Sequence, residues 1–299
     1  MKQALKQAIL NTVGESRYQG IRLLFKKKTP SLIDLEIGNI TIKCPDNHPL
    51  VQWKSSQPYR DLAIGIVAKF VGQKYPKQKV IDIGANIGDT AAMISNYANN
   101  PLVLVEPSDY FYEILMQNLK VIPNVERVEK IIISDGKSKV GFLREWEASA
   151  YFEHLDENGY EFPSKKIEEV ADSTTKLVKI DTDGFDFSII QASLEWLSKL
   201  QPLLFYENQI RDVKSFNDSN QVLENLVGIG YKYFIVWDDP GFYLISTSNI
   251  NHLLDLNRYL FKVWSSNSPH KSIYNYDFLC LPSCDQDIFE FVANYYRSY

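Results

Sequence analysis

Short apolar runs alternate with amphipathic stretches along the chain from residue 59 onward. Seven runs have the length and composition of buried strands. They cover residues 79–83, 102–105, 128–133, 177–180, 203–206, 231–236 and 277–281.

Apolar residues at helical spacing predict helices before, between and after these strands. The predicted helices are a region from Tyr59 that Pro76 ends, residues 89–98, residues 108–120 with Ser108 as N-cap, a segment with Ile190, Leu194 and Leu197, residues 222–227, and a last helix with Ile288, Phe291, Val292 and Tyr295 on one stripe. Residues 32–42 alternate in the manner of a hairpin. Continuous apolar strands that are each followed by a helix predict an α/β fold, with a mostly parallel sheet and helices on both faces.

Composition and charge narrow the classes of function. The chain has 299 residues, 32 Lys and Arg against 37 Asp and Glu, and a net charge of −5. This balance argues against a nucleic-acid partner. No stretch reaches the roughly 18 apolar residues of a transmembrane segment. The N-terminus does not resemble a signal peptide, so we expect a cytoplasmic protein.

Three cysteines occur in the sequence, namely Cys44, Cys280 and Cys284. An odd number without regular spacing does not suit a disulfide framework, and no partner residues complete a zinc site beside the last two. We therefore expect buried thiols.

Acidic residues stand where the predicted strands end. In parallel sheets ligands bind at the carboxyl ends of the strands, so these residues carry the functional information. The strand-end groups are the glycine-rich turn from Asp82 to Asp89, Glu106, Asp135, Asp181-Thr182-Asp183 and Glu207-Asn208.

The glycine-rich turn has two interpretations, a dinucleotide site or a site for an adenosyl cofactor without phosphates. The turn carries Asp82 and Asp89 but neither Lys nor Arg. Two carboxylates would repel a diphosphate and would suit a sulfonium and an α-amino group. The sequence therefore favours S-adenosyl-L-methionine, and Glu106 is placed to accept the ribose hydroxyls.

Five segments together resemble the FkbM family of S-adenosylmethionine-dependent methyltransferases. They read VIDIGANIGDT, LVEPS, IISDGK, LVKIDTDGFD and PLLFYEN. The lysine-isoleucine-aspartate block is the family-specific part. The family usually continues it as Asp-Val-Glu-Gly-x-Glu, whereas this chain has the shorter acids Asp183 and Asp186.

The resemblance implies a class I methyltransferase fold, which is Rossmann-like and has a seven-stranded sheet. Residues 56–299 would form this domain, and residues 1–55 would form an N-terminal extension or cap. It implies O-methylation of a sugar hydroxyl in a glycan, a glycolipid or a natural product, in a context such as polysaccharide biosynthesis. Tyr59 or Arg60 is a further candidate, for the cofactor carboxylate. The implied cofactor contacts are Asp82, Gly84, Asn86 and Gly88 for the methionine part, Glu106 for the ribose and Asp135 for the adenine.

Two mechanisms for activating the acceptor hydroxyl remain open. One uses a general base, for which Asp181, Asp183 and His154 are the candidates. The other uses Mg²⁺ or another divalent cation, held by Asp181, Glu207 and Asn208, because oxygen ligands at adjacent strand ends suit such ions.

Two other functions also remain open. Asp181-Thr182-Asp183 matches the D-x-D pattern of metal-dependent glycosyltransferases, and the shortened acids leave room for a non-catalytic S-adenosylmethionine-binding scaffold. The expected partner is a small-molecule or glycan acceptor. Residues 1–50 are a candidate arm for a homodimer.

Overall fold

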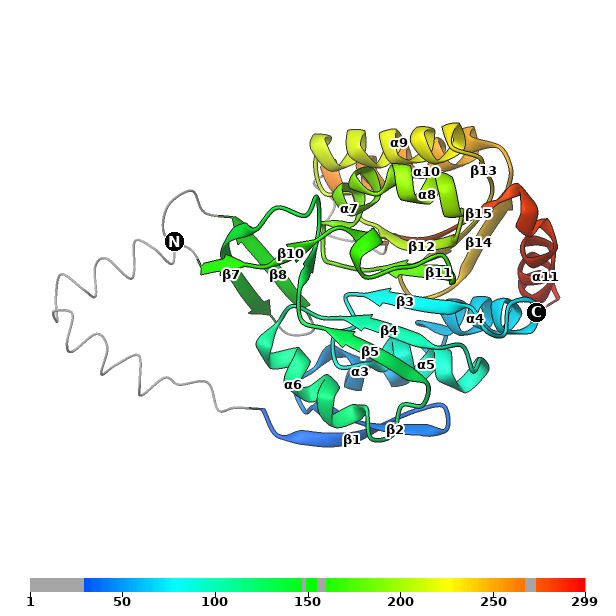
Figure 1. Ribbon diagram of the computed structural model, residues 1–299. Coiled ribbons are helices and arrows are strands. Elements are labelled where there is room, and N and C mark those ends of the chain that lie inside the picture. Colours follow the sequence, from blue (N-terminus) through cyan, green and yellow to red (C-terminus); the bar gives the residue numbers. More distant parts are fainter. Residues whose placement is uncertain (1–29, 147–148, 155–159, 267–272, 299) are drawn as a thin grey trace, which may run out of the picture. The chain divides into compact units, whose positions relative to one another are not determined.

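The computed structural model describes residues 30–146, 149–154, 160–266 and 273–298, with only the backbone described at residues 142, 144–146 and 149–154 (Figure 1). The chain divides into two units, Met1–Leu32 and Ile33–Tyr299. The sheet and its helices belong to the second unit.

The second unit is built on an eight-stranded sheet in the order β14-β13-β15-β12-β11-β3-β4-β5. Strands β5, β4, β3, β11 and β12 run parallel to one another, β15 runs antiparallel to β12 and β13, and β14 runs antiparallel to β13. Six of the seven predicted strands are present in this sheet, the predicted strand 128–133 overlaps β5 only at its start, and β14 adds a strand at the edge. The strand bounds are β3 Lys79–Ile83, β4 Leu102–Val105, β5 Val125–Glu129, β11 Thr175–Ile180, β12 Leu203–Asn208, β13 Tyr231–Asp238, β14 Tyr243–Thr247 and β15 Tyr276–Pro282.

Helices cover both faces of this sheet, as the apolar strands predict (Figure 1). Successive strand side chains point to opposite faces, so Val80 joins one core and its neighbour Ile81 joins the other. The first core packs beneath α4 Leu62–Lys74, α5 Asp89–Tyr97, α6 Asp109–Asn118 and α11 Gln286–Arg297. The second packs beneath α7 Asp186–Ala192, α8 Leu194–Leu200, α9 Val213–Gly228 and α10 Ile250–Ser265.

The predicted hairpin is present as β1 Leu32–Ile37 and β2 Ile40–Pro45, and α3 Pro49–Ser56 follows it. Asn118 at the end of α6 accepts a hydrogen bond from the Lys43 amide at 2.7 Å and donates to the carbonyls of Lys43 and Ile87. Cys44 and Leu50 join the first core. The part of the predicted extension from Ile33 onward therefore packs with the sheet.

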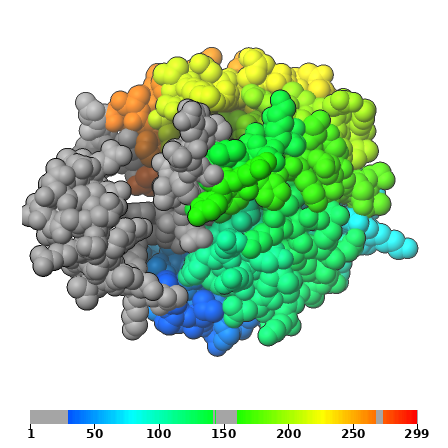
Figure 2. Space-filling view, turned by 60° about the vertical axis from the view of Figure 1, so that its left-hand side comes forward, coloured from blue at the N-terminus to red at the C-terminus, as the bar shows by residue number. Residues whose placement is uncertain are grey.

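The connection between β5 and β11 contains strands of its own. These are β6 Ile132–Ile133, β7 Lys139–Trp146, β8 Ser149–His154, β9 Tyr160–Phe162 and β10 Ser164–Lys165, before a 3-10 turn at Ile167–Glu169. β7 pairs antiparallel with both β8 and β9 and is the central strand of a three-stranded sheet in the order β8-β7-β9, and β6 pairs with β10. Figure 2 shows the mid-green residues of this connection between the yellow residues of α9 and the blue-green residues that precede them in the chain.

Several expectations need correction. The predicted strand 128–133 is two strands, β5 and β6, and the helix expected around Ile190 and Leu197 is two helices, α7 and α8. Phe291 of α11 is 57% exposed and does not belong to the buried stripe. Cys284 is also exposed, whereas Cys44 and Cys280 are buried. No helix in the described part of the chain is long and apolar enough to cross a membrane.

Candidate functional site

Two adjoining pockets lie where β3, β4, β11 and β12 end. The first, here called the apolar pocket, encloses about 710 Å³ including space open to solvent. The second, here called the acidic pocket, encloses about 1150 Å³ on the same measure. The two share Gly84, Asn86, Asp181 and Asp183, so they form one continuous site.

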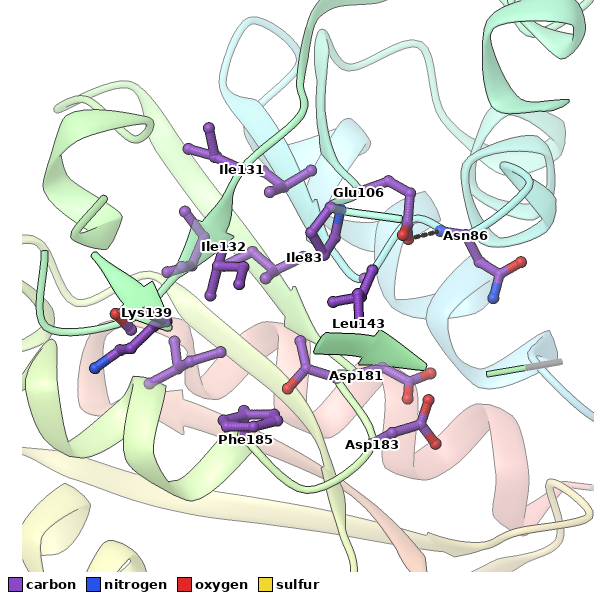
Figure 3. A pocket seen from close by; sticks show the side chains of 17 residues that line it. Ile83, Asn86, Glu106, Ile131, Ile132, Lys139, Leu143, Asp181, Asp183 and Phe185 are labelled. Carbon is purple, nitrogen blue, oxygen red and sulfur yellow. Dashed lines mark hydrogen bonds between the residues drawn. The ribbon is translucent and has the colours of Figure 1, made fainter. Parts of the chain in front are cut away.

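Carbon side chains form most of the apolar pocket. Figure 3 shows Phe185 across from Ile83 and Ile132, while Glu106 and Asn86 stand together on another side. Asp181 and Asp183 lie beside one another, away from Lys139 (Figure 3). The apolar lining is made by Ile83, Val105, Pro107, Ile131, Ile132, Ile133, Leu143, Phe185 and Ile189.

Glu106 is a buried carboxylate that lines this pocket, with 3% of its surface exposed. Its Oε2 accepts a hydrogen bond from the Asn86 amide at 2.8 Å, and its Oε1 accepts one from the Ser108 amide at 2.8 Å. A carboxylate has about four acceptor positions, so each oxygen keeps one for a hydroxyl group. Burial raises the pKa of Glu106 to about 7 against these hydrogen bonds. Ser108 caps α6 as predicted.

The glycine-rich turn after β3 touches the loop after β11. The Asp181 amide donates to the Ile83 carbonyl at 3.0 Å. Gly84 has a φ of +86°, and a Cβ at this position would lie 1.8 Å from the Asp181 carbonyl oxygen. Glycine is therefore required at residue 84, both for its backbone conformation and for the close approach of the two loops.

Lys179 supplies a cation that the turn itself lacks. Its side chain is 6% exposed, and its Nζ lies 3.1 Å from Asp82 Oδ1 and 3.3 Å from Asp181 Oδ2. Burial opposes its charge, but the surrounding carboxylates hold the pKa of Lys179 well above its usual value. Asp82 is fully buried against this lysine and is absent from the lining of either pocket. The structure thus places Asp82 behind the turn, whereas the sequence led us to expect it along the cofactor.

Six carboxylates and two cations line the acidic pocket. Both cations are paired, because Lys179 contacts Asp181 and Arg60 Nη1 lies 2.9 Å from Asp239 Oδ1. Burial is the largest cause that raises the pKa of the Asp61 and Asp89 carboxyls, each to about 6. The six carboxylates are Asp61, Asp89, Asp181, Asp183, Glu207 and Asp239. The pocket therefore favours a ligand that carries positive charge.

Arg60 belongs to the wall of this pocket and is not a surface charge. Its guanidinium lies 3.8 Å from the centroid of the Trp53 ring and donates to Gln57 Oε1 at 3.0 Å. Tyr59, the neighbouring candidate, is 48% exposed and lies edge-on to Phe242.

Glu207 and Asn208 lie on opposite faces of β12, because side chains alternate along a strand. Glu207 lines the acidic pocket, where its Oε1 accepts from Asn275 Nδ2 at 2.5 Å. Burial and then the Asp181 carboxylate raise the pKa of Glu207 well above its usual value. Asn208 is fully buried on the other face, where its side chain bonds to Asn257 at 2.9 Å and Ser219 at 2.6 Å.

The expected metal set of Asp181, Glu207 and Asn208 is consequently not assembled. Within the described ranges, no group of three or more His, Cys, Asp or Glu side chains is arranged to hold a metal ion. Lys179 instead places a positive charge beside Asp181.

The remaining expected residues take varied positions. Gly84, Asn86 and Glu106 line the site, whereas Gly88 lies behind it, where a Cβ would meet Leu115 at 2.8 Å. Asp135 stands beside the apolar pocket, where its Oδ1 pairs with Lys139 Nζ at 2.8 Å. This hydrogen bond lowers the pKa of Asp135 to about 2. The backbone of His154 ends β8, and its side chain lies outside the described atoms.

Sequence reasoning missed Lys179, His48, Trp53 and the apolar lining. The lysine-isoleucine-aspartate block of the sequence includes Lys179. The residue was assigned no role, because the apolar pattern of the strand does not show that this side chain faces a pocket. Asp186 was visible as a shortened acid, yet its Oδ2 accepts from Thr182 Oγ1 at 2.9 Å and so holds the loop after β11.

Replacing Gly84 with alanine is expected to destabilise the protein by more than about 4 kcal/mol, because a Cβ cannot fit against Asp181. Gly184→Ala is the matched control, since Gly184 also has a positive φ, +109°, but has nothing within 4 Å of the added atom. The control should cost about 1–3 kcal/mol from backbone strain alone. Urea unfolding measures the free energy of unfolding of both variants. Equal decreases for Gly84→Ala and Gly184→Ala would contradict the close contact of the two loops.

The free energy of unfolding of the ligand-free protein should fall from pH 6 to pH 8. Asp61, Asp89, Glu106 and Asp186 have folded-state pKa values raised to about 6 or 7. The folded state therefore holds protons that the unfolded state has already released near pH 4, and stability is lost as pH rises through the folded pKa. The decrease is on the order of 2–3 kcal/mol.

Burial lowers the pKa of His48 to about 4, so this residue makes the free energy of unfolding rise with pH. That contribution is confined to pH values below about 6.5, the pKa of the ring in the unfolded chain. Urea titrations at each pH test the trend, and Glu106→Gln should flatten it. A stability that rises between pH 6 and pH 8 would contradict the assignment of these buried carboxyls.

Comparisons with known proteins concern the family of this chain and the structures to which it is similar. Residues 82–233, slightly more than half of the chain, match the Methyltransferase FkbM domain. Among solved structures, an FkbM methyltransferase from Methylobacillus flagellatus KT is similar at 13% identity over 68% of this chain and 43% of that chain, with a TM-score of 0.35. The plantazolicin methyltransferase BamL, solved with a desmethylPZN analogue and SAH, is similar at 10% identity over 78% of this chain and 89% of that chain, with a TM-score of 0.42.

A precorrin-6y C5,15-methyltransferase from Geobacter metallireducens GS-15 is similar at 15% identity over 69% of this chain and 80% of that chain, with a TM-score of 0.35. No curated protein sequence matches the chain. The domain match covers the turn after β3, the loop after β11 and the end of β12, which contribute residues to both pockets or to the acidic pocket. The chain therefore belongs to the FkbM family of methyltransferases.

Proposed function

We propose that this protein is an S-adenosyl-L-methionine-dependent O-methyltransferase that acts on a hydroxyl group of a sugar. The observation that carries the proposal is Glu106, a buried carboxylate at the edge of an apolar pocket with an acceptor position left on each oxygen. Such a carboxylate suits the paired hydroxyls of a ribose, and the apolar lining suits a flat purine.

The acidic pocket suits the other end of the same cofactor. A sulfonium and an α-amino group carry two positive charges, and the pocket offers carboxylates that its own two cations do not fully neutralise. The domain match favours methyl transfer over glycosyl transfer, and a pocket with no excess of cations is a poor site for a diphosphate. When bound, the cofactor supplies an electrophilic methyl group at its sulfonium.

The chain's own residues would position the acceptor and take its proton. Methyl transfer is a displacement at carbon, so holding the acceptor oxygen in place supplies much of the rate. Asp181 and Asp183 line both pockets and are the proposed bases that receive the hydroxyl proton. His154 stays a candidate for the same role.

Polar and aromatic groups in the acidic pocket support a sugar as the acceptor. Trp53 and Tyr274 offer ring surfaces, while Gln209 and Asn275 offer amides for hydroxyl groups. Tyr274 and Asn275 come from the segment between β13 and β15, which therefore contributes to the pocket. A glycan, a glycolipid or a hydroxylated natural product would each present such an acceptor.

Calorimetry of cofactor binding tests the proposal directly. We expect the protein to bind S-adenosylmethionine and S-adenosylhomocysteine, and not to bind a nucleotide sugar, because the cations that line the described part of the acidic pocket are already paired with carboxylates. Glu106→Gln should weaken both adenosyl ligands by about 10-fold or more, since an amide cannot accept at both positions. Binding of the nucleotide sugar alone would overturn the proposal in favour of a glycosyltransferase.

Turnover should depend on the carboxylates at the end of β11. If a residue is the general base, its replacement by asparagine should lower kcat by about 100- to 10,000-fold, the usual contribution of a general base. The two variants to test are Asp181→Asn and Asp183→Asn. Asp183→Glu is the matched control, because it keeps a carboxylate at that position and should retain most of the activity. The assay follows a labelled methyl group from the cofactor to a panel of oligosaccharides and hydroxylated small molecules.

Mass spectrometry of the product would identify an O-methyl ether. We also expect activity in EDTA to equal that in its absence, because Lys179 already supplies positive charge beside Asp181. Full turnover by both asparagine variants would show that neither aspartate is the base. Binding of the cofactor without methyl transfer to any hydroxyl would support the alternative of a non-catalytic scaffold.

A further inference from the structure

A third hollow opens from the acidic pocket between the β1–β2 hairpin, α3 and the first turns of α5, and is here called the hairpin groove. It encloses about 680 Å³ including space open to solvent. No described residue lines both the groove and the apolar pocket. The acidic pocket therefore connects the other two hollows into one path. The groove and the acidic pocket share Leu50, Trp53, Gln57, Arg60, Asp61 and Asp89.

The walls of the hairpin groove are tied together by hydrogen bonds. Asn96 of α5 accepts from the Asn39 amide at 2.7 Å and donates to the Ile37 carbonyl at 2.7 Å, which fastens the hairpin turn to the helix. Gly38 in this turn has a φ of +57°, and a Cβ there would lie 2.6 Å from the Asn96 side chain. The groove is thus a preformed hollow, as ligand sites usually are.

Trp53 stands where the groove meets the acidic pocket, because it lines both. The Arg60 guanidinium lies 3.8 Å from the centroid of its ring, a distance at which a cation is attracted to the ring face. Arg60 also donates to Gln57 Oε1 at 3.0 Å and to the Asp239 carbonyl at 3.2 Å. The ring and the guanidinium therefore hold each other in place at the junction of the two hollows.

The lining of the groove combines carbon side chains with hydrogen-bonding groups. Ile37 and Leu50 contribute buried carbon side chains, whereas Glu36 and Lys54 are exposed, with Lys54 Nζ 3.8 Å from Glu36 Oε2. An exposed ion pair contributes little to stability, so both groups stay available to hydroxyls of a ligand. A sugar ring has carbon–hydrogen faces and hydroxyl edges, so it matches a lining of this kind.

The proposed cofactor is accommodated without the groove. Its purine and ribose suit the apolar pocket, and its sulfonium and amino group suit the acidic pocket. The acceptor oxygen has to meet the methyl group on the sulfonium, so the methylated sugar belongs in the acidic pocket. A second sugar attached to it would continue along the path into the hairpin groove.

We propose that the hairpin groove binds the sugar unit next to the one that is methylated, so that the acceptor is a disaccharide or a longer glycan and not a free monosaccharide. This inference rests on the proposed function and narrows the class of acceptor. Trp53, Glu36 and Lys54 bind that second sugar and do not take part in the chemical step.

Transfer of a labelled methyl group to matched acceptors tests this on the full chain. The acceptors are the methyl glycosides of glucose, galactose, mannose and rhamnose, and disaccharides built from the same sugars. Lys54→Trp fills the groove from its rim, because Lys54 lines the groove and not the acidic pocket. Gln52→Trp is the comparison, since Gln52 is exposed on the same helix and is absent from the described lining of all three hollows.

We expect the unaltered chain to methylate at least one disaccharide with a kcat/KM about 10-fold or more above that of the corresponding methyl glycoside, because hydrogen bonds to charged groups add affinity. Lys54→Trp should remove this preference, and Gln52→Trp should keep it. Calorimetry should show that both variants bind S-adenosylhomocysteine within about 2-fold of the unaltered chain.

Equal kcat/KM values for disaccharides and methyl glycosides in the unaltered chain would overturn the second subsite and leave the proposed function standing. So would a preference that survives Lys54→Trp, or a loss of S-adenosylhomocysteine binding in that variant. If no sugar accepts a methyl group, the sugar acceptor of the proposed function fails and this inference fails with it. If Lys54→Trp does not fold, Glu36→Trp decides in the same way, because it fills the groove from β1.

Discussion

The burial of Lys179 among carboxylates is the interaction on which the site depends. An ammonium group in a protein interior costs several kcal/mol unless it is closely paired, and here Asp82 and Asp181 lie within 3.3 Å of it. The three residues come from two adjacent strands, β3 and β11, and from the loop that follows β11. Pairing them therefore fixes the position of that loop against the glycine-rich turn.

The same ion cluster divides the site into two chemical environments. On one side, the ends of β3, β4 and β6 present carbon side chains and the hydrogen-bonded carboxylate of Glu106. On the other, the loops around Arg60 and Asp239 enclose a pocket in which carboxylates outnumber cations. A ligand that is apolar and hydroxylated at one end and cationic at the other satisfies both environments, and the proposed cofactor has this character.

Much of the fold could be predicted because buried strands and amphipathic helices leave strong periodic signals. The helix α10 was not predicted, although Leu253 and Leu260 recur at helical spacing on its buried face, where Asn257 between them is also fully buried. The strands β7, β8 and β9 were not among the predicted strands. β7 has eight residues of mixed polarity, and its pairing with β8 and β9 depends on contacts between segments that local periodicity does not identify.

Part of the site could also be predicted, because residues at the ends of parallel strands must meet at one edge. Gly84, Asn86, Glu106, Asp181, Asp183 and Glu207 all line it. The errors came from the directions of side chains. Asp82 and Asn208 point away from the pockets, and alternation along β12 alone was enough to separate Asn208 from Glu207. Trp53 and Lys179 were missed because their roles depend on which neighbours surround them after folding.

A crystal structure of the protein with S-adenosylhomocysteine is the most direct test of how the site is divided. The account predicts the purine among Ile131, Ile132 and Phe185, both ribose hydroxyls on Glu106, and the amino-acid end in the acidic pocket. A ligand bound with its purine in the acidic pocket, or with no contact to Glu106, would contradict it.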